Sequence, residues 1–110
     1  MARRFAVEWA EVARTDLDEV LDYIEQEEPG AALAVLERLE QAAKRLESLP
    51  LRGRVVPELA QRNIRLYREL LVRPWRIIYR VGKDRVLVLA VLDGRRDLEG
   101  LLLSRLLRRT

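Results

Sequence analysis

The 110-residue chain contains no cysteine and no histidine, and these two absences remove most metal and redox chemistry from consideration. Without cysteine there is no disulfide framework and no thiolate nucleophile. Without histidine, zinc and iron sites lose their commonest nitrogen ligand, and catalytic triads lose their usual base. We therefore expect no metal site and no cofactor.

Long apolar runs are also missing, because no stretch of 18 consecutive apolar residues occurs. The N-terminal segment has two arginines but only a short apolar run, interrupted by Glu8 and Glu11, which is not the pattern of a signal peptide. We expect a cytoplasmic protein with no membrane partner. With 49% hydrophobic and 35% charged residues, residues 1–110 have the composition of a single compact domain.

Charge is abundant, and its two signs are separated along the chain. Residues 1–50 carry 6 basic and 12 acidic side chains, a net charge of −6, whereas residues 51–110 carry 15 basic and 6 acidic ones, a net charge of +9. Arginine supplies 19 of the 21 basic residues, and a compositional bias toward arginine explains that number but not the separation. The second half is thus predicted to offer a positive surface to a polyanion or an acidic partner.

The apolar periodicity predicts the order strand, helix, helix, strand, strand, strand, helix. We expect a helix capped by Thr15, with Asp18 at the reciprocal capping position, and a second helix ending near Leu49. The remaining expected elements are strands over 5–9, 66–72, 75–81 and 85–92, a helical turn within the loop at 57–61, and a C-terminal helix over 97–109 capped by Asp97. The predicted fold class is α+β, with a helical hairpin packed on a small, mainly antiparallel sheet.

The strand at 75–81 carries two arginines inside a run that reads as core. Alternation places Trp75, Ile77 and Tyr79 on one face of the sheet. Arg76 and Arg80 then project from the opposite face. Because the guanidinium fork suits carboxylates and phosphates, these two arginines predict either ion pairs or an anion-binding surface.

Three stretches carry a family resemblance: "RLESLPLRGRVVPEL" (45–59), "LYRELLVRPWRIIYRV" (66–81) and "VLVLAVLDGRRDLEGLL" (86–102). At this spacing they resemble the RelE/ParE superfamily of toxins from type II toxin–antitoxin systems, over nearly the whole chain. The long helical hairpin and the "GRVVPEL" loop look more like the ParE branch, also called plasmid stabilisation proteins, than like the compact RelE nucleases. The family fold is a helical hairpin on an antiparallel sheet, in agreement with the order above.

The resemblance implies one of two activities. RelE-like members cleave mRNA on the ribosome, with basic residues that hold phosphate and a C-terminal Tyr or His that moves a proton; ParE-like members inhibit DNA gyrase without a nuclease site. No Tyr or His follows Arg96, and Asp93 stands where relatives often have histidine. Tyr67, Tyr79 or Asp93 would have to replace it. The implied phosphate-holding residues are Arg76, Arg95, Arg96, Arg52 and Arg54, and the wider anion- or partner-binding set is Arg76, Arg80, Arg95 and Arg96.

We therefore expect a ParE-like gyrase inhibitor that a cognate antitoxin neutralises. A RelE-like ribosome-dependent endoribonuclease is the alternative, and a non-toxic antitoxin-binding module is a further one. The leucine-rich C-terminal helix predicts either docking on the protein's own sheet or contact with an antitoxin or a second copy, so both a homodimer and a toxin–antitoxin hetero-oligomer remain open. The leucines concerned are Leu98, Leu101, Leu102 and Leu106.

Overall fold

A five-stranded sheet is the centre of the molecule. The structure, a computed structural model, describes residues 3–95 and 98–107. Strand order across the sheet is β1-β5-β4-β3-β2, with β1 parallel to β5 and the other neighbours antiparallel. The strands are β1 (Ala6–Trp9), β2 (Arg54–Val55), β3 (Tyr67–Val72), β4 (Trp75–Val81) and β5 (Arg85–Asp93).

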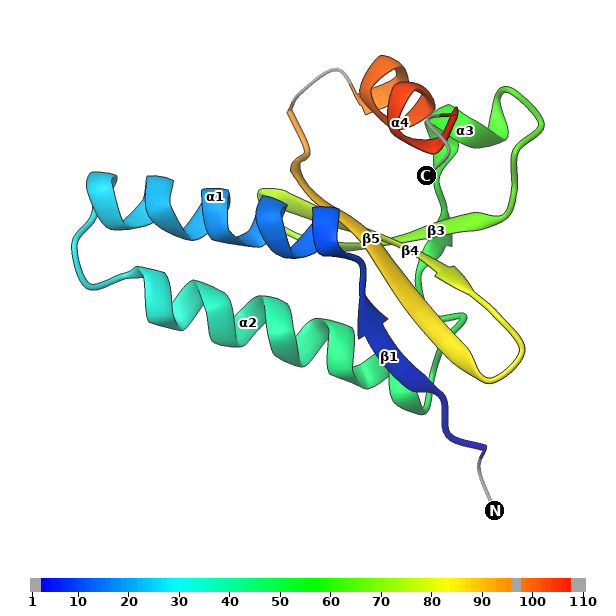
Figure 1. Ribbon diagram of the computed structural model, residues 1–110, viewed down its shortest axis with the longest axis horizontal. Helices are drawn as coiled ribbons and strands as arrows, with labels where there is room; N and C mark the ends of the chain where they lie inside the picture. The colour runs from blue at the N-terminus through cyan, green and yellow to red at the C-terminus, as the bar shows by residue number, and fades with distance from the viewer. Residues whose placement is uncertain (1–2, 96–97, 108–110) are drawn as a thin grey trace.

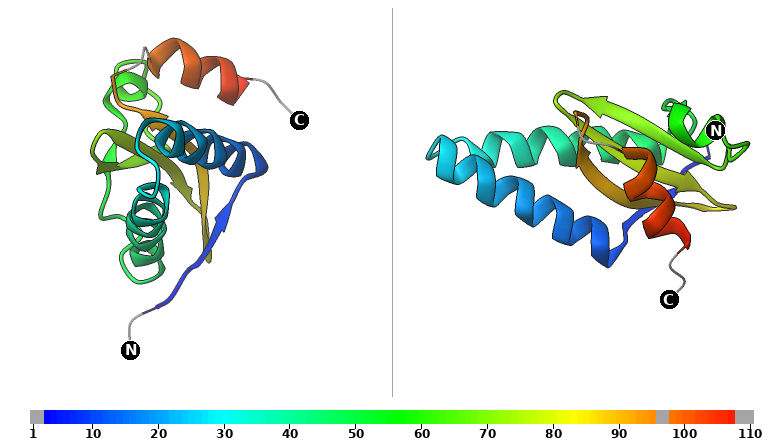
Figure 2. Two further views of the ribbon diagram at one scale, coloured as in Figure 1. Left: turned by 90° about the vertical axis from the view of Figure 1, so that its left-hand side faces the viewer. Right: turned by 90° about the horizontal axis from the view of Figure 1, so that it is seen from above.

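The helices form two groups that lie on different sides of this sheet. Helices α1 (Glu11–Glu27) and α2 (Ala32–Lys44) run side by side as an antiparallel hairpin, and a 3-10 turn, η1 (Arg45–Glu47), follows α2. The short α3 (Pro57–Ala60) and the C-terminal α4 (Leu98–Leu107) lie together on the other side. Figure 1 shows the hairpin reaching well beyond the sheet, and Figure 2 shows the same two groups from two further directions.

Two apolar clusters result, one on each face of the sheet. The cluster under the hairpin joins the inner sides of α1 and α2 to β3, β4 and β5, and its fully buried members include Leu39, Leu46, Ile77, Tyr79 and Val88. The cluster on the other face joins α3 and α4 to β4 and β5 through Val56, Leu59, Ile78, Ala90, Leu92, Leu98 and Leu102. Strand β5 supplies side chains to both clusters, which is why it is apolar on both parities.

The predicted fold class and element order are confirmed, and β4 has the predicted bounds. Two details were wrong. Helix α1 begins at Glu11, four residues before Thr15, because the chain turns into the helix directly after β1 through the extended Ala10. The Thr15 hydroxyl donates to the Glu11 carbonyl inside the helix at 3.2 Å, and Asp18 is exposed, so neither residue caps.

The second detail is β2, a two-residue strand within the segment expected to be a loop. It pairs with β3 through Arg54 opposite Glu69 and Val55 opposite Arg68. Asp97, the predicted cap of the last helix, lies outside the described residues. Within residues 3–95 and 98–107, no helix has the length and apolar character needed to cross a membrane.

Candidate functional site

Arg76, the arginine that the sequence placed at the centre of an anion site, is buried on the α3/α4 face and surrounded by carboxylates. Its Nε donates to Glu69 Oε1 at 2.6 Å, and its two terminal nitrogens donate to both oxygens of Glu58 at 2.8 Å. Arg76 is only 8% exposed. The guanidinium therefore has the forked, two-oxygen partner that a phosphate would offer, but the protein supplies it.

Glu69 links this pair to a second arginine. Its side chain is fully buried, and Arg54 Nε donates to its other oxygen at 2.5 Å. Arg54, Glu58, Glu69 and Arg76 thus form one chain of alternating charge, here called the arginine–glutamate network, with two positive and two negative groups. Because the charges cancel, the network has no net attraction for a further anion.

The elements hold the network in register. Strand pairing sets Glu69 opposite both Arg54 of β2 and Ile78 of β4, which brings it close to Arg76 two residues along the same face. Glu58 comes from the first turn of α3. The hydrogen bonds donated by Arg76 are the main cause that lowers the pKa of the Glu58 carboxyl below its ordinary value of 4.5, and the same contact raises the pKa of Arg76. The contact between Glu58 and Arg76 thus favours the charged form of both groups.

The other candidate arginines are scattered. Arg80 is exposed, but it sits opposite Leu87, at the far end of β4 from Arg76, which sits opposite Leu92. Arg95 follows β5 with its side chain 79% exposed, and it pairs with Asp93 at 2.7 Å. The alternation of β4 is confirmed, but the inference that Arg76 faces outward is wrong, because α3 and Glu69 cover it.

Three further arginines belong to the predicted set: Arg52, Arg54 and Arg96. Arg52 is exposed beside the outer edge of β3, away from Arg76, while Arg54 belongs to the arginine–glutamate network. Arg96 lies outside the described residues. The structure thus joins Arg54 and Arg76 through Glu69, and it does not bring Arg80 and Arg95 to the same place.

The candidates for proton transfer are also engaged. Tyr79 faces the hairpin, as its parity predicts, where its hydroxyl donates to Pro50 O at 2.8 Å and accepts from Gly53 N at 2.9 Å. Burial raises the pKa of this phenol above its ordinary value of 10.0. A Cβ on Gly53 would lie 2.6 Å from the Tyr79 oxygen, so this approach requires glycine. Tyr79 fastens the 50–53 loop to the sheet.

Asp93 accepts hydrogen bonds from the Arg95 backbone and side chain. Tyr67 is half-buried and packs against the α3/α4 cluster. Neither residue lies in the arginine–glutamate network, so the structure brings no proposed proton donor to the side chain of Arg76 among the residues it describes.

The leucines predicted as partner contacts are mostly internal. Leu98 and Leu102 are 2% and 1% exposed and pack on Ile78 and Ala90 of their own sheet, so they do not offer a surface to an antitoxin or a second copy. Leu101 is half-buried at the margin of the same cluster, and the side chain of Leu106 lies outside the described part of the chain. The docking of α4 on its own sheet corrects the prediction for Leu98 and Leu102.

Asp16 is a buried polar residue whose structural role the sequence did not predict. Asp16 of α1 accepts from Val91 N at 3.0 Å and pairs with Arg105 of α4 at 2.7 Å. Strand β1 ends opposite Val88 and therefore does not reach Val91. The Asp16 carboxylate instead accepts the hydrogen bond from the Val91 amide. Asp16 thereby ties α1, β5 and α4 together.

Glu58 and Glu69 were missed as well. Glu69 directly precedes the apolar run Leu70–Val72 within β3, and a carboxylate inside a strand is a signal that it pairs with a cation on a neighbouring strand. Glu58 has no such signal, since a glutamate in the first turn of a helix is ordinary. Within the described ranges, no three acidic side chains gather in a way that would hold a metal ion.

Residues 7–98 match the family model described as "ParE toxin of type II toxin-antitoxin system, parDE". The chain is 36% identical over 84 residues to Toxin ParE3 of Caulobacter vibrioides, a match that covers 76% of this chain and 80% of that toxin.

Two solved structures share the fold. A chromosomal ParDE toxin–antitoxin system from P. aeruginosa superposes with a TM-score of 0.70 at 22% identity, covering 82% of this chain and 96% of the other. The toxin–antitoxin complex RelBE2 from Mycobacterium tuberculosis gives a TM-score of 0.57 at 23% identity, covering 83% of this chain and 92% of the other. At these identities the two superpositions establish the fold.

Proposed function

The chain belongs to the ParE toxin family of type II toxin–antitoxin systems, and we propose that it inhibits DNA gyrase and is held inactive by a cognate antitoxin. The target is a cytoplasmic enzyme, so the proposed site of action is the cytoplasm. In such a module the toxin acts when the antitoxin is lost, which accounts for stabilisation of a plasmid that encodes both.

The observation that carries the choice of target is the internal neutralisation of Arg76. A nuclease of this fold needs arginines open to the phosphate and a side chain that moves a proton, a contribution of roughly 10²–10⁴ in rate. Here Glu58 and Glu69 occupy the guanidinium of Arg76. The chain also has no histidine and no tyrosine after Tyr79. Inhibition by binding requires neither feature.

A supercoiling assay tests the proposal. Purified toxin is titrated into DNA gyrase acting on relaxed plasmid, and the expected result is loss of supercoiling in a dose-dependent manner. Toxin premixed with the product of the reading frame adjacent to its gene is the control, and it should leave supercoiling intact. Full supercoiling at excess free toxin would refute gyrase inhibition.

A second measurement distinguishes the alternatives. Primer extension on translated mRNA should give no cleavage products with this toxin; ribosome-dependent cuts would instead establish a nuclease. Normal growth after induction of the toxin alone, with protein present and folded, would favour a non-toxic antitoxin-binding module.

A further inference from the structure

The outer edge of β3 is open past Glu69, the last β3 residue that pairs with β2. Strand β2 pairs with β3 only at Glu69 and Arg68, and Val56 N donates to Tyr67 O just before them. Because backbone groups alternate between the two sides of a strand, the amide and carbonyl of Leu71 point to the same open side as those of Tyr67. No other strand of residues 3–95 covers that edge.

A groove runs along this open edge. It has a volume of about 390 Å³ between the end of α2, the 52–54 loop and β3. We call it the β3-edge groove and define it by Arg45, Arg52, Arg54, Leu70, Leu71 and Val72. Leu71 is 44% exposed, and Leu49 and Leu51, in the loop that leads to Arg52, are 58% and 61% exposed. The groove therefore offers apolar contacts beside unpaired backbone groups.

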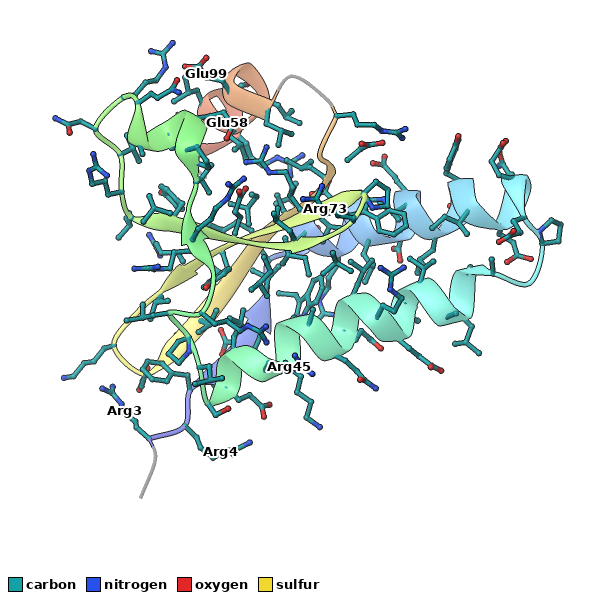
Figure 3. The ribbon with its side chains drawn as sticks, turned by 180° about the vertical axis from the view of Figure 1, so that it is seen from behind. Arg3, Arg4, Arg45, Glu58, Arg73 and Glu99 are labelled. Carbon is teal, nitrogen blue, oxygen red and sulfur yellow. The ribbon has the colours of Figure 1, made fainter. Side chains whose placement is uncertain are left out.

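The groove carries positive charge that is only partly neutralised by acidic side chains of the described residues. Arg54 is paired with Glu69, but Arg45 and Arg52 form no ion pair with any residue that the structure describes. Figure 3 shows Arg45 where α2 ends, away from Glu58 on α3. Two free guanidinium groups next to an open strand edge suit an extended acidic chain, because carboxylates pair with the arginines while the backbone extends the sheet.

The opposite edge of the sheet lacks this character. At β1, Arg4 pairs with Glu47 at 2.8 Å and Arg85 with Glu8 at 3.2 Å, while Arg3 lies over the Phe5 ring and donates to Lys83 O. Phe5 N also donates to Glu47 O at 2.8 Å, which occupies part of the backbone on that side. The β3 edge, in contrast, places two arginines without an ion pair among the described residues, Arg45 and Arg52, beside an open strand edge.

We propose that the β3-edge groove binds an extended acidic segment of the cognate antitoxin, which adds a short strand to β3 at Leu71 and pairs its carboxylates with Arg45 and Arg52. This inference rests on the antitoxin neutralisation proposed above and assigns it a place on the chain.

The test measures binding of the purified product of the adjacent reading frame to the full chain by calorimetry. R45E/R52E should weaken its affinity by roughly 10-fold or more at low salt and by less at high salt. The matched control, R80E/K83E, makes the same change in charge at the β4–β5 turn and should bind like wild type. Melting curves establish that each variant is folded, and R45Q/R52Q replaces the reversal if it is not.

Amide exchange gives a second, independent readout. In the complex, hydrogen exchange at the Leu71 amide should slow by at least about 10-fold, because that N–H gains a strand partner. Unchanged Leu71 exchange together with equal affinities for the two variants would overturn the groove assignment while leaving neutralisation intact. No binding to wild type would overturn neutralisation itself. Loss of duplex DNA binding in R45E/R52E, with the protein partner still bound, would make the groove a nucleic-acid site and overturn the inference.

Discussion

The two faces of the sheet are closed in different ways. Under the helical hairpin, Ile77 and Tyr79 pack against Leu39 and Leu46 in a layer that is apolar except for one tethered hydroxyl. Under α3 and α4, the apolar cluster lies beside the arginine–glutamate network, in which Glu69 and Arg76 are buried together. The same strand, β4, contributes to both faces through alternate residues.

The difference shows how a charged residue in a core strand can be structural. An apolar face is stabilised by the burial of apolar surface, so many combinations of apolar residues can form it. A buried arginine needs carboxylates at the right distance, and here they come from β3 and α3. By analogy with nucleases of this fold, Arg76 would bind a phosphate on this face. In this protein the carboxylates of Glu58 and Glu69 contact Arg76 instead.

The largest expected effect is that of removing Arg76. R76M leaves the fully buried Glu69 with only Arg54, so we expect a loss of about 3–5 kcal/mol in the free energy of unfolding, measured in urea. R80M is the control on the same strand and face, and it should change stability little because Arg80 is exposed. Equal stability of the two variants would mean that the network contributes nothing.

A smaller effect is expected on the hairpin face. Y79F removes the hydroxyl that donates to Pro50 O and accepts from Gly53 N, and both backbone groups then lack a partner. The expected loss is about 1–3 kcal/mol, with faster amide exchange at Gly53. Y67F, which changes a tyrosine on the other face, is the comparison; an identical exchange pattern in the two variants would remove the tethering role of Tyr79.

The Asp16–Arg105 pair links the two sides of the molecule and is expected to matter less. R105M should lower stability by about 1 kcal/mol, because Arg105 is partly exposed, and should speed amide exchange in α4 more than in α2. R95M, which breaks an exposed pair with Asp93, should leave α4 unaffected. Unchanged exchange in R105M would show that the apolar contacts of α4 suffice.

The smallest expected effect is on the pH dependence of folding stability. The pKa of Glu58 is lower in the folded protein than its ordinary value of 4.5, so the unfolded chain binds a proton first. The stabilisation is therefore complete above pH 4.5 and is lost as pH falls through the lower, folded pKa. E58Q should flatten this part of the stability curve, while E37Q, on the exposed surface of α2, should not. A parallel decline in all three proteins would exclude Glu58 as the source.

The sequence predicted the fold where local patterns were enough. The bounds of β4 followed from periodicity and a helical turn was expected at 57–61, whereas the α1 start was missed because Thr15 resembles a cap. The network could not be predicted in the same way, because Glu58 and Glu69 are far from each other in the chain and meet Arg76 only through strand register and α3. Parity indicated the face of Arg76 but not what covers it.

The central claim is that Arg76 supports the fold and does not act on the target. The most direct test is the double variant R76M/E69L, which replaces the buried pair with apolar residues of similar size and is expected to fold. The account predicts that this variant inhibits gyrase supercoiling at the same concentrations as wild type. A variant that melts like wild type but no longer inhibits would contradict the account and return Arg76 to the functional site.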